Sequence, residues 1–512
     1  MGESKLKRLA REEMLMACSG VQTMAGRVQV RWETESVATP LGQLAYFIEF
    51  LNLTGLWSRW LESCPLTYTS PNAPTKAEVL GTWLLSMLAG HRRYAHVTTM
   101  RCDGINPGLL GMRKVISEDA LRNALKRIPE TEGVAWLDGH LTDSVAPLLD
   151  APWILDGDTT IKVLYGHQEG ALLGYNPKKP GRPSHAYHTY LMAGLRQVLG
   201  VEVSPGNEHT ARHAQPGLLK LLDALPPEKK PRLVRGDNAF GNDLLMAALE
   251  ERDQPYLFKL KLSKNVKRHI SSLFRQSGWT DAGQGWEGKD GELALTGWEH
   301  KRRVVVLRRA LTGEIMAEGE ADGQQLLAFV ESNRRDGKGI TGYEYAVLVT
   351  NTDYEVLSLG QLYRDRADAE NAFDELKNQW GWGGFTTRDL HRCQLAARGV
   401  ALAYNWWSLF VRLARPDVRH EAITSRPWLM ASVGRRTEHA GQTTITLTGL
   451  HAHFEKAQAA LMRVSALLQG WNAQAAEQLH PATVWQCVCD HLKRALAGIG
   501  PPSTFQLIKN HA

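Results

Sequence analysis

The sequence predicts an α/β protein with a mixed sheet that is interrupted by a β-rich insertion and flanked by mainly helical regions. Three observations support this prediction. Strand-like and helical segments alternate between residues 151 and 265, glycine-rich connections and strands follow up to 354, and helical patterns dominate before 150 and after 410. At 512 residues the chain is too long for one ordinary core, so several domains are expected.

The first 150 residues are expected to be mainly helical. The segment 76–88 has a helical apolar pattern, and Thr75 with Glu78 three residues later is expected to form a capping box. Ser117 is expected to cap a second helix, which carries several basic side chains.

Residues 151–265 have the element order of one α/β core. The expected elements are a strand at 153–164, two strands within 186–206, a helix at 211–225, a strand at 231–237, a helix at 242–253 and a strand at 255–262. Three strands followed by alternating helix and strand is the order of an RNase H-like domain.

A β-rich insertion is expected at 266–354. Strand-like segments at 304–307 and 343–350 are joined by glycine-rich connections such as 283–291. After it, one long helix is predicted to run from Ser358, an expected N-cap, to about Trp380, where a group of glycines ends it.

This helix carries an aromatic, an acidic and two basic residues at a regular spacing, namely Tyr363, Arg366, Glu370 and Lys377. At roughly 100° per residue, all four side chains fall within a stripe about 60° wide. An acid that binds a metal, flanked by basic groups that bind phosphates, needs this geometry. A solvent-exposed face with ion pairs would give the same spacing.

Two aspartates add to the pattern. Asp158 lies inside an apolar strand, and Asp237 ends the strand at 231–237. A carboxylate in such a position is costly unless it is paired or bound to metal. Asp156 is two residues before Asp158, so both point to the same side of the strand and periodicity cannot choose between them.

These segments resemble the bacterial insertion-sequence transposases with an RNase H-like DDE core and a Tyr-Arg-Glu-Lys signature. Asp158 opens an Asp-Thr-Thr motif, Asp237 follows a strand, and the four residues of the helix stripe complete the signature in order. The segment 165–177 resembles one subgroup of these enzymes. The resemblance covers roughly residues 150–400, and on its first motif we choose Asp158 over Asp156.

The resemblance implies a DNA transposase, an endonuclease that binds the ends of its insertion sequence and carries out cut-and-paste transposition. Asp158, Asp237 and Glu370 would be the catalytic residues and would bind two Mg²⁺ ions, with Mn²⁺ as a substitute. Arg366 and Lys377 would bind phosphates and Tyr363 would position the DNA strand. In relatives with this signature, excision passes through a hairpin at the transposon end before strand transfer.

Further DNA contacts are expected outside the signature. Lys178, Lys179 and Arg182 crowd a loop after the first catalytic strand and are expected to follow the DNA backbone, although a solvated loop would look the same. Trp298, beside a basic run in the insertion, is the candidate for stacking on an extruded base, although a core tryptophan is the commoner case.

The composition limits the other classes. A content of 43% hydrophobic and 22% charged residues excludes a disordered or fibrous chain, and a net charge of +6 permits nucleic-acid binding. The charged start and the polar residues within 400–414 argue against a secretory signal and a membrane span. Six cysteines without metal-type spacing indicate reduced thiols, so we expect a bacterial cytoplasmic protein that joins the nucleoid through DNA.

We expect a homodimer on double-stranded DNA, because a transposon has two ends and this chain carries one set of acids. The alternatives are a domesticated RNase H-like DNA-binding protein and a nuclease without strand transfer. The expected regions are a helical DNA-binding region at 1–150, the first part of the catalytic core at 151–265, the insertion at 266–354, the second part of the core at 355–410 and a helical region at 411–512.

Overall fold

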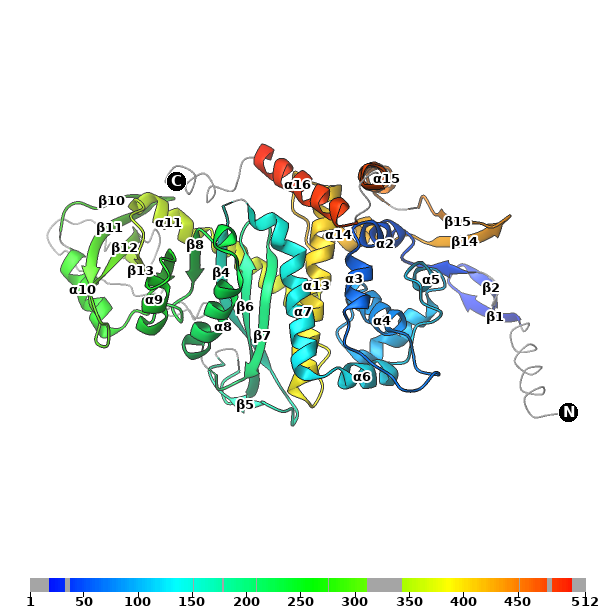
Figure 1. Ribbon diagram of the computed structural model, residues 1–512, viewed down its shortest axis with the longest axis horizontal. Helices are drawn as coiled ribbons and strands as arrows, with labels where there is room; N and C mark the ends of the chain where they lie inside the picture. The colour runs from blue at the N-terminus through cyan, green and yellow to red at the C-terminus, as the bar shows by residue number, and fades with distance from the viewer. Residues whose placement is uncertain are drawn as a thin grey trace.

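The computed structural model describes residues 18–32, 37–150, 152–176, 179–208, 210–274, 276–310, 343–450, 452–476 and 481–499. The main sheet lies in the middle of the molecule (Figure 1). The strands of the insertion lie at one end of the long axis, and the N-terminal helices lie at the other.

The centre of the sheet has the strand order β7-β6-β4-β8-β9. These strands are β4 (Ile154–Val163), β6 (Pro183–Met192), β7 (Gln197–Pro205), β8 (Leu233–Gly236) and β9 (Tyr256–Lys259). The first three pair antiparallel, whereas β8 and β9 run parallel to β4. This arrangement confirms the predicted RNase H-like mixed sheet.

The insertion extends this sheet beyond β9. Its strands are β10 (Thr280–Gly283), β11 (Trp286–Leu293), β12 (Arg302–Ala310) and β13 (Tyr343–Thr350). β13 pairs antiparallel with β9, and β12, β11 and β10 follow in order. A glycine-rich connection was expected at 283–291. This expectation is wrong for most of that range, because Gly288 and Gly291 lie within β11. A Cβ at Gly288 would come within 2.2 Å of Val356, so this glycine lets the following helix pack closely on the strand.

Different helices cover the two faces of the sheet. They are α8 (Thr210–Ala224), α9 (Asp243–Glu250), α10 (Lys264–Phe274), α11 (Val356–Arg364) and α12 (Ala367–Gln379). Val304 and Val306 of β12 belong to the large core cluster that includes α9 and α10. Val305 and Leu307 belong to the cluster that includes α11, so α11 packs on the opposite face from α9 and α10.

The predicted long helix is in fact two helices, α11 and α12, and Ser358 lies inside the first rather than capping it. In a continuous helix the Arg366 amide would donate to the Leu362 carbonyl. Here it donates to the Tyr363 carbonyl at 3.2 Å. The Leu362 carbonyl accepts a hydrogen bond from the buried guanidinium of Arg235 instead. A contact from the sheet therefore accompanies the break at the signature motif.

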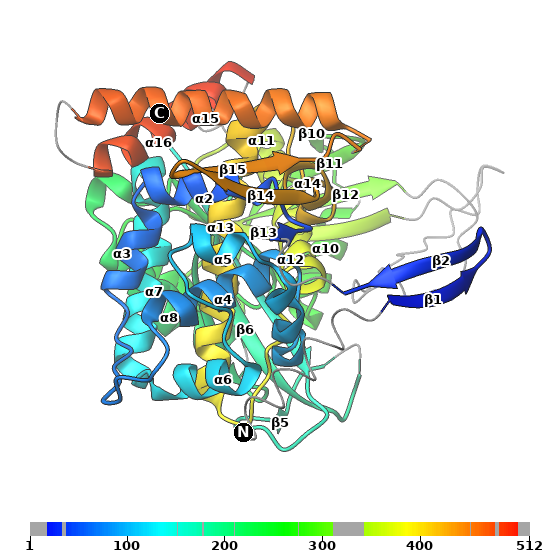
Figure 2. The same ribbon diagram turned by 90° about the vertical axis from the view of Figure 1, so that its right-hand side faces the viewer.

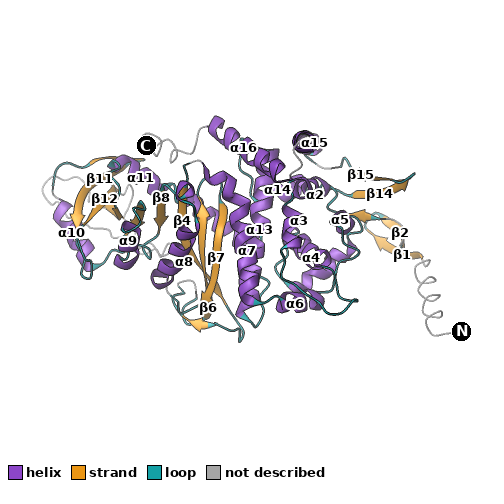
Figure 3. Cartoon of the chain, viewed as in Figure 1, coloured by secondary structure: helices purple, strands orange, loops and turns teal. Residues whose placement is uncertain are grey.

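The N- and C-terminal regions pack into one body beside β7 (Figure 3). The largest helices are α2 (Leu44–Leu53), α4 (Lys76–Leu88), α6 (Glu118–Arg127), α7 (Glu130–Val145), α13 (Leu390–Ala414), α15 (Phe454–Ala476) and α16 (Pro481–Ile499). The capping box of Thr75 and Glu78 and the Ser117 cap are both present. The boundary expected at 410 falls inside α13, which packs against α7 and β7.

These regions also contain strands that the helical pattern did not predict. β1 (Cys18–Thr23) and β2 (Gly26–Arg31) form a hairpin. β14 (Gly434–His439) pairs with β15 (Gln442–Leu447) and with β3 (Ala38–Thr39) near the start of the chain. Figure 2 shows the long helix α15 above the β14–β15 hairpin. Among the described helices, none is long and apolar enough to cross a membrane.

Candidate active site

Asp158 and Asp237 are brought together by neighbouring parallel strands. β4 and β8 pair with Asp156 opposite Arg235. Two residues further along each strand are Asp158 and Asp237, so the same register places them next to each other at the carboxyl end of β8. The charge of Asp237 also raises the pKa of Asp158, which places the two carboxylates within electrostatic reach of each other.

Asp156 has a different environment from Asp158. Both of its carboxylate oxygens accept hydrogen bonds from Arg235, each at 2.7 Å, and both side chains are 1% exposed. The same guanidinium donates to the Leu362 carbonyl. Asp156 therefore anchors the end of α11 to the sheet and has no oxygen free of the arginine.

Arg366 joins the first aspartate to the glutamate of α12. Its guanidinium lies 3.4 Å from a carboxylate oxygen of Asp158 and 3.4 Å from one of Glu370. Arg366 is buried, whereas the Glu370 side chain is 64% exposed and has room to move. Tyr363 is half-buried on the preceding helix, and its pKa is shifted by the charges of Arg366, Asp237 and Glu370. The structure thus places Asp158 beside Asp237 and links Asp158 to Glu370 through Arg366.

The pKa of Asp158 depends on its burial and on several charges nearby. Burial raises its pKa to about 6, and the negative charges of Asp237 and Glu370 add to the rise. The Arg366 guanidinium and a 2.7 Å hydrogen bond from the Thr159 amide act in the opposite direction. Burial raises the pKa of Tyr363 to about 12, so its hydroxyl stays protonated at neutral pH.

Lys259 belongs to the site but was not found from the sequence. β8 and β9 pair with Gly236 opposite Phe258, so Lys259 follows in register beside Asp237. Burial and the charge of Arg366 lower its pKa, whereas Asp237 and Glu370 raise it. The available signal was a lysine at the end of an otherwise apolar strand, on the same edge of the sheet as the aspartate.

The donor set fits divalent metal. Mg²⁺ prefers oxygen ligands and takes only one or two protein carboxylates, with waters and substrate phosphates completing its shell. Within the described residues no three acidic, histidine or cysteine side chains converge on a single point. Beyond the effect of burial, the charges of Asp237 and Glu370 nevertheless raise the pKa of Asp158, so the acids form a negative site of the kind that binds such cations.

The remaining predicted DNA contacts lie elsewhere. Lys377 is half-buried on α12, two turns after Glu370. Lys178 falls outside the described residues, and Lys179 and Arg182 lie against the ring of Tyr165.

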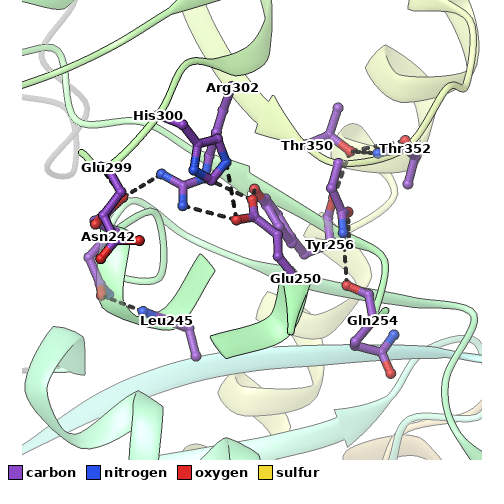
Figure 4. A network of polar contacts seen from close by, with 12 residues as sticks. Asn242, Leu245, Glu250, Gln254, Tyr256, Glu299, His300, Arg302, Thr350 and Thr352 are labelled. Atoms are coloured by element: carbon purple, nitrogen blue, oxygen red, sulfur yellow. Dashed lines mark hydrogen bonds and ion pairs between the residues drawn. The ribbon is translucent and has the colours of Figure 1, made fainter. Parts of the chain in front are cut away.

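Trp298 is not brought to the carboxylates in any described contact. It packs against Arg302, with the guanidinium carbon 5.3 Å from its ring centroid. Arg302 is in turn held by Asp243 and by both oxygens of Glu250, at 2.8 and 3.0 Å (Figure 4). Arg303, the next residue, pairs across the sheet with Thr350, which in turn pairs with Leu257. Along the strands, this row of paired residues comes two residues before the row that leads to Asp237.

Trp286 is the tryptophan of the insertion that shares a face with the signature helices. It packs on the same core cluster as Tyr363, beside α11. The guanidinium carbon of Arg309 lies 5.0 Å from its ring centroid. Arg309 is near the carboxyl end of β12, the end opposite to Arg302.

Comparison with known proteins identifies the family of the chain. Residues 152–406 match the family model of the transposase DDE domain, a range that contains Asp158, Asp237 and Glu370. The chain is therefore a DDE transposase, a metal-dependent enzyme that cleaves DNA and transfers the cut strand.

Among solved structures, the chain is similar to the piggyBac transposase in its synaptic complex with hairpin DNA. The two are 11% identical, with a TM-score of 0.38, over 90% of this chain and 88% of that chain. No curated protein matches the chain.

Proposed function

We propose that the chain binds the ends of its own insertion sequence and excises it by cut-and-paste transposition, with Asp158, Asp237 and Glu370 as the catalytic carboxylates. The observation that supports this assignment is the meeting of these acids at the carboxyl end of β8, around Arg366. The neutralised Asp156 is the alternative first acid, and its complete pairing with Arg235 argues against it.

The three carboxylates would hold Mg²⁺, which supplies Lewis-acid stabilisation of the phosphate oxygens and a nucleophile at neutral pH. Asp158, between Asp237 and Arg366, is placed to contact metal on one side and the signature helix on the other. The exposed side chain of Glu370 would close the site when metal and DNA arrive.

Arg366 would exchange partners when DNA binds. In the structure its positive charge offsets Asp158 and Glu370 at 3.4 Å each. Metal ions would take over that role, and the guanidinium would then bind a phosphate beside the cut with its paired N–H groups. Lys377 and Lys259 would add positive charge around the same strand, and the protonated Tyr363 would donate a hydrogen bond to it.

Excision through a hairpin would require one base to leave the stack. Unstacking costs a few kcal/mol, and an aromatic ring returns about 1–3 kcal/mol. Trp298 was the candidate from sequence, but Trp286 lies on the face of α11 and Tyr363. We therefore propose Trp286 for this role. Trp286→Ala should slow hairpin formation by roughly tenfold, about 1.4 kcal/mol, with normal first-strand nicking. Trp298→Ala is the matched control, and the reverse result would restore Trp298.

A homodimer on DNA is proposed, with one active site for each transposon end. The apolar segment around 461–468 would be a candidate for the contact between the two chains, but it is not a free contact surface. Leu461, Val464 and Leu468 of α15 are buried inside the chain. Light scattering of the protein bound to two end duplexes tests this proposal, and one chain holding both ends would refute it.

The function is tested with a duplex that spans the junction of the terminal inverted repeat and the flanking DNA. The protein with Mg²⁺ should bind the repeat, nick at the junction, form a hairpin and join the released end to a second duplex. Nicking without joining would support the nuclease alternative. End binding without nicking would support the domesticated DNA-binding protein.

A further inference from the structure

An exposed tyrosine with two cations against it lies at the far end of the first catalytic strand. Tyr165 follows β4 and is 68% exposed. Lys179 Nζ lies 5.1 Å and the Arg182 guanidinium carbon 5.6 Å from its ring centroid. Lys179 also donates a hydrogen bond to the Tyr165 hydroxyl. Arginine, lysine and tyrosine are among the side chains with which proteins bind the phosphates of DNA.

A cavity of about 590 Å³ opens beside this ring, and Arg182 and Arg388 both line it. No described carboxylate pairs with Lys179, Arg182 or Arg388. Glu169 is the one acidic residue in the wall, and one of its oxygens accepts a hydrogen bond from the Leu390 amide at 3.0 Å. Two arginines against one acid in the wall, with Lys179 on the same tyrosine ring, leave the cavity positive.

Another cavity of the protein has arginines that are paired with carboxylates. It has a volume of about 640 Å³ and is lined by Arg302 and Arg303. Arg302 is neutralised by Asp243 and Glu250, and Arg303 pairs with Asp290 at 2.6 Å. Its arginines are therefore used within the fold, whereas those beside Tyr165 remain available to an anion.

The cavity beside Tyr165 is built rather than incidental. The Glu169 amide donates to the Arg388 carbonyl at 2.8 Å, which ties the loop after β4 to the segment before α13. The buried side chain of Asn176 accepts a hydrogen bond from the Lys179 amide at 3.1 Å, which positions the lysine. Cations from two distant segments are thus held around one ring.

The place of this site relative to the carboxylates indicates which anion it binds. Tyr165 is seven residues after Asp158 on the continuation of one strand, so the two lie roughly 20 Å apart. Duplex DNA rises 3.4 Å for each base pair. A duplex with its scissile phosphate at Asp158 therefore reaches Tyr165 about six base pairs away.

We propose that Tyr165, Lys179, Arg182 and Arg388 form a second DNA-binding site that grips the phosphate backbone about six base pairs from the cut. This inference rests on the proposed function and adds to it Tyr165, Arg388 and the position of the contact. The strand is either the transposon end or the flanking DNA, which present the same phosphates.

The test is a binding titration without divalent metal, so that cleavage has no part in it. The probes are end duplexes in which one phosphate at a time is replaced by a neutral methylphosphonate, four to nine base pairs on either side of the cut. The wild-type protein should lose about threefold to tenfold in affinity at one position near six base pairs. Sensitivity on the repeat side identifies the transposon end, and sensitivity on the other side identifies flanking DNA.

The Arg388→Gln and Arg182→Gln variants should bind the natural duplex with an affinity that is lower by a similar factor. Replacing the phosphate at that position by a neutral methylphosphonate should not weaken their binding further. The slope of log affinity against log salt should fall by about 0.9 for each phosphate that the variant no longer neutralises. Tyr165→Ala should also weaken binding, and Lys301→Gln in the neutralised cavity is the control. Full methylphosphonate sensitivity in both arginine variants would overturn the inference. If the wild-type protein does not prefer the end to a scrambled duplex, the proposed function itself fails.

Discussion

Asp156 and Asp158 lie two residues apart on the same side of β4, and each has an arginine beside it. The two aspartate–arginine pairs have opposite properties. Asp156 and Arg235 form two hydrogen bonds of 2.7 Å, and both are almost completely buried. Asp158 is 3.4 Å from Arg366, keeps 21% of its side chain exposed and shares the arginine with Glu370.

The difference separates a structural pair from the pair that we propose to be part of the active site. A buried carboxylate whose oxygens are both bound to one arginine has its charge compensated, and removing that partner leaves a charge in a low-dielectric environment. An acid that is only partly compensated gains from a cation; burial raises the pKa of Asp158 to about 6, and the charges of Asp237 and Glu370 add to the rise. Position within the strand does not distinguish the two acids. Their partners do.

The largest expected effect is on catalysis. Asp158→Asn should abolish cleavage, because several kcal/mol of charge stabilisation by metal is lost, on the order of 10³-fold or more in rate. End binding without metal should be close to normal, since basic groups hold the DNA. Nicking and gel-shift assays measure the two properties, with Asp237→Asn and Glu370→Gln as companions.

Asp156→Asn is the matched variant for Asp158→Asn, and its main effect should be a lower free energy of unfolding. Activity at low temperature should survive in the fraction that folds. An active Asp158→Asn together with a folded but inactive Asp156→Asn would reverse the assignment of the first acid.

The second prediction concerns the structural pair. Arg235→Met removes the partner of Asp156 and the donor to Leu362, and breaking a buried pair in this way costs about 3–5 kcal/mol. The Asp156→Leu, Arg235→Met double variant should recover much of that loss in chemical denaturation. No recovery would mean that the arginine acts mainly through the Leu362 carbonyl.

Local sequence patterns were sufficient for much of the fold. The capping box of Thr75 and Glu78 depends on residues three apart, and β13 was predicted at its observed bounds from a run of strand-forming residues. The three candidate acids were named from local features, the carboxylate in an apolar strand and the spacing of the signature, but the choice of Asp158 over Asp156 came from the resemblance to the transposase motif.

What could not be predicted depends on contacts between distant residues. Arg235, which neutralises Asp156, is 79 residues away from it, and its bond to Leu362 at the helix break spans 127 residues. Trp286 and Trp298 have similar local sequences rich in glycine and charge. Only the pairing of β11 with β12, which places Trp286 opposite Arg309, and the packing of Trp298 on Arg302 show that their arginine partners lie at opposite ends of β12.

The third prediction tests the sharing of Arg366. Arg366→Gln removes the positive charge that lowers the pKa of Asp158, so that pKa should rise further. Cleavage should fall by about 10²-fold, as for the loss of one preorganised charge-stabilising donor. The pH at which the remaining rate is half-maximal should move upward. A rate loss without a shift in the pH profile would mean that Arg366 contacts DNA but does not influence Asp158.

The smallest effect concerns pH and metal in the free protein. The folded pKa of Asp158, about 6, is above its ordinary value of 3.8, so its charge destabilises the fold above pH 6. As pH falls from 6 towards 3.8 the carboxyl of the folded protein takes up a proton and this penalty shrinks, and below 3.8 it is gone. Metal binding must displace that proton, so the apparent Kd for Mg²⁺ should be about fourfold weaker at pH 5.5 than at pH 7.5.

Thermal shift with and without Mg²⁺ at the two pH values measures this linkage. Without metal, Asp158→Asn should raise Tm at pH 7.5 by about 1–4 °C, because the penalty of the charged carboxylate is gone. At pH 5 the variant and the wild-type protein should melt closer together. An Mg²⁺-induced shift of equal size at both pH values would show that Asp158 is already ionised throughout this range. The contrast between Asp158 and the fully paired Asp156 would then lie in how accessible the carboxylate oxygens are to a ligand rather than in charge.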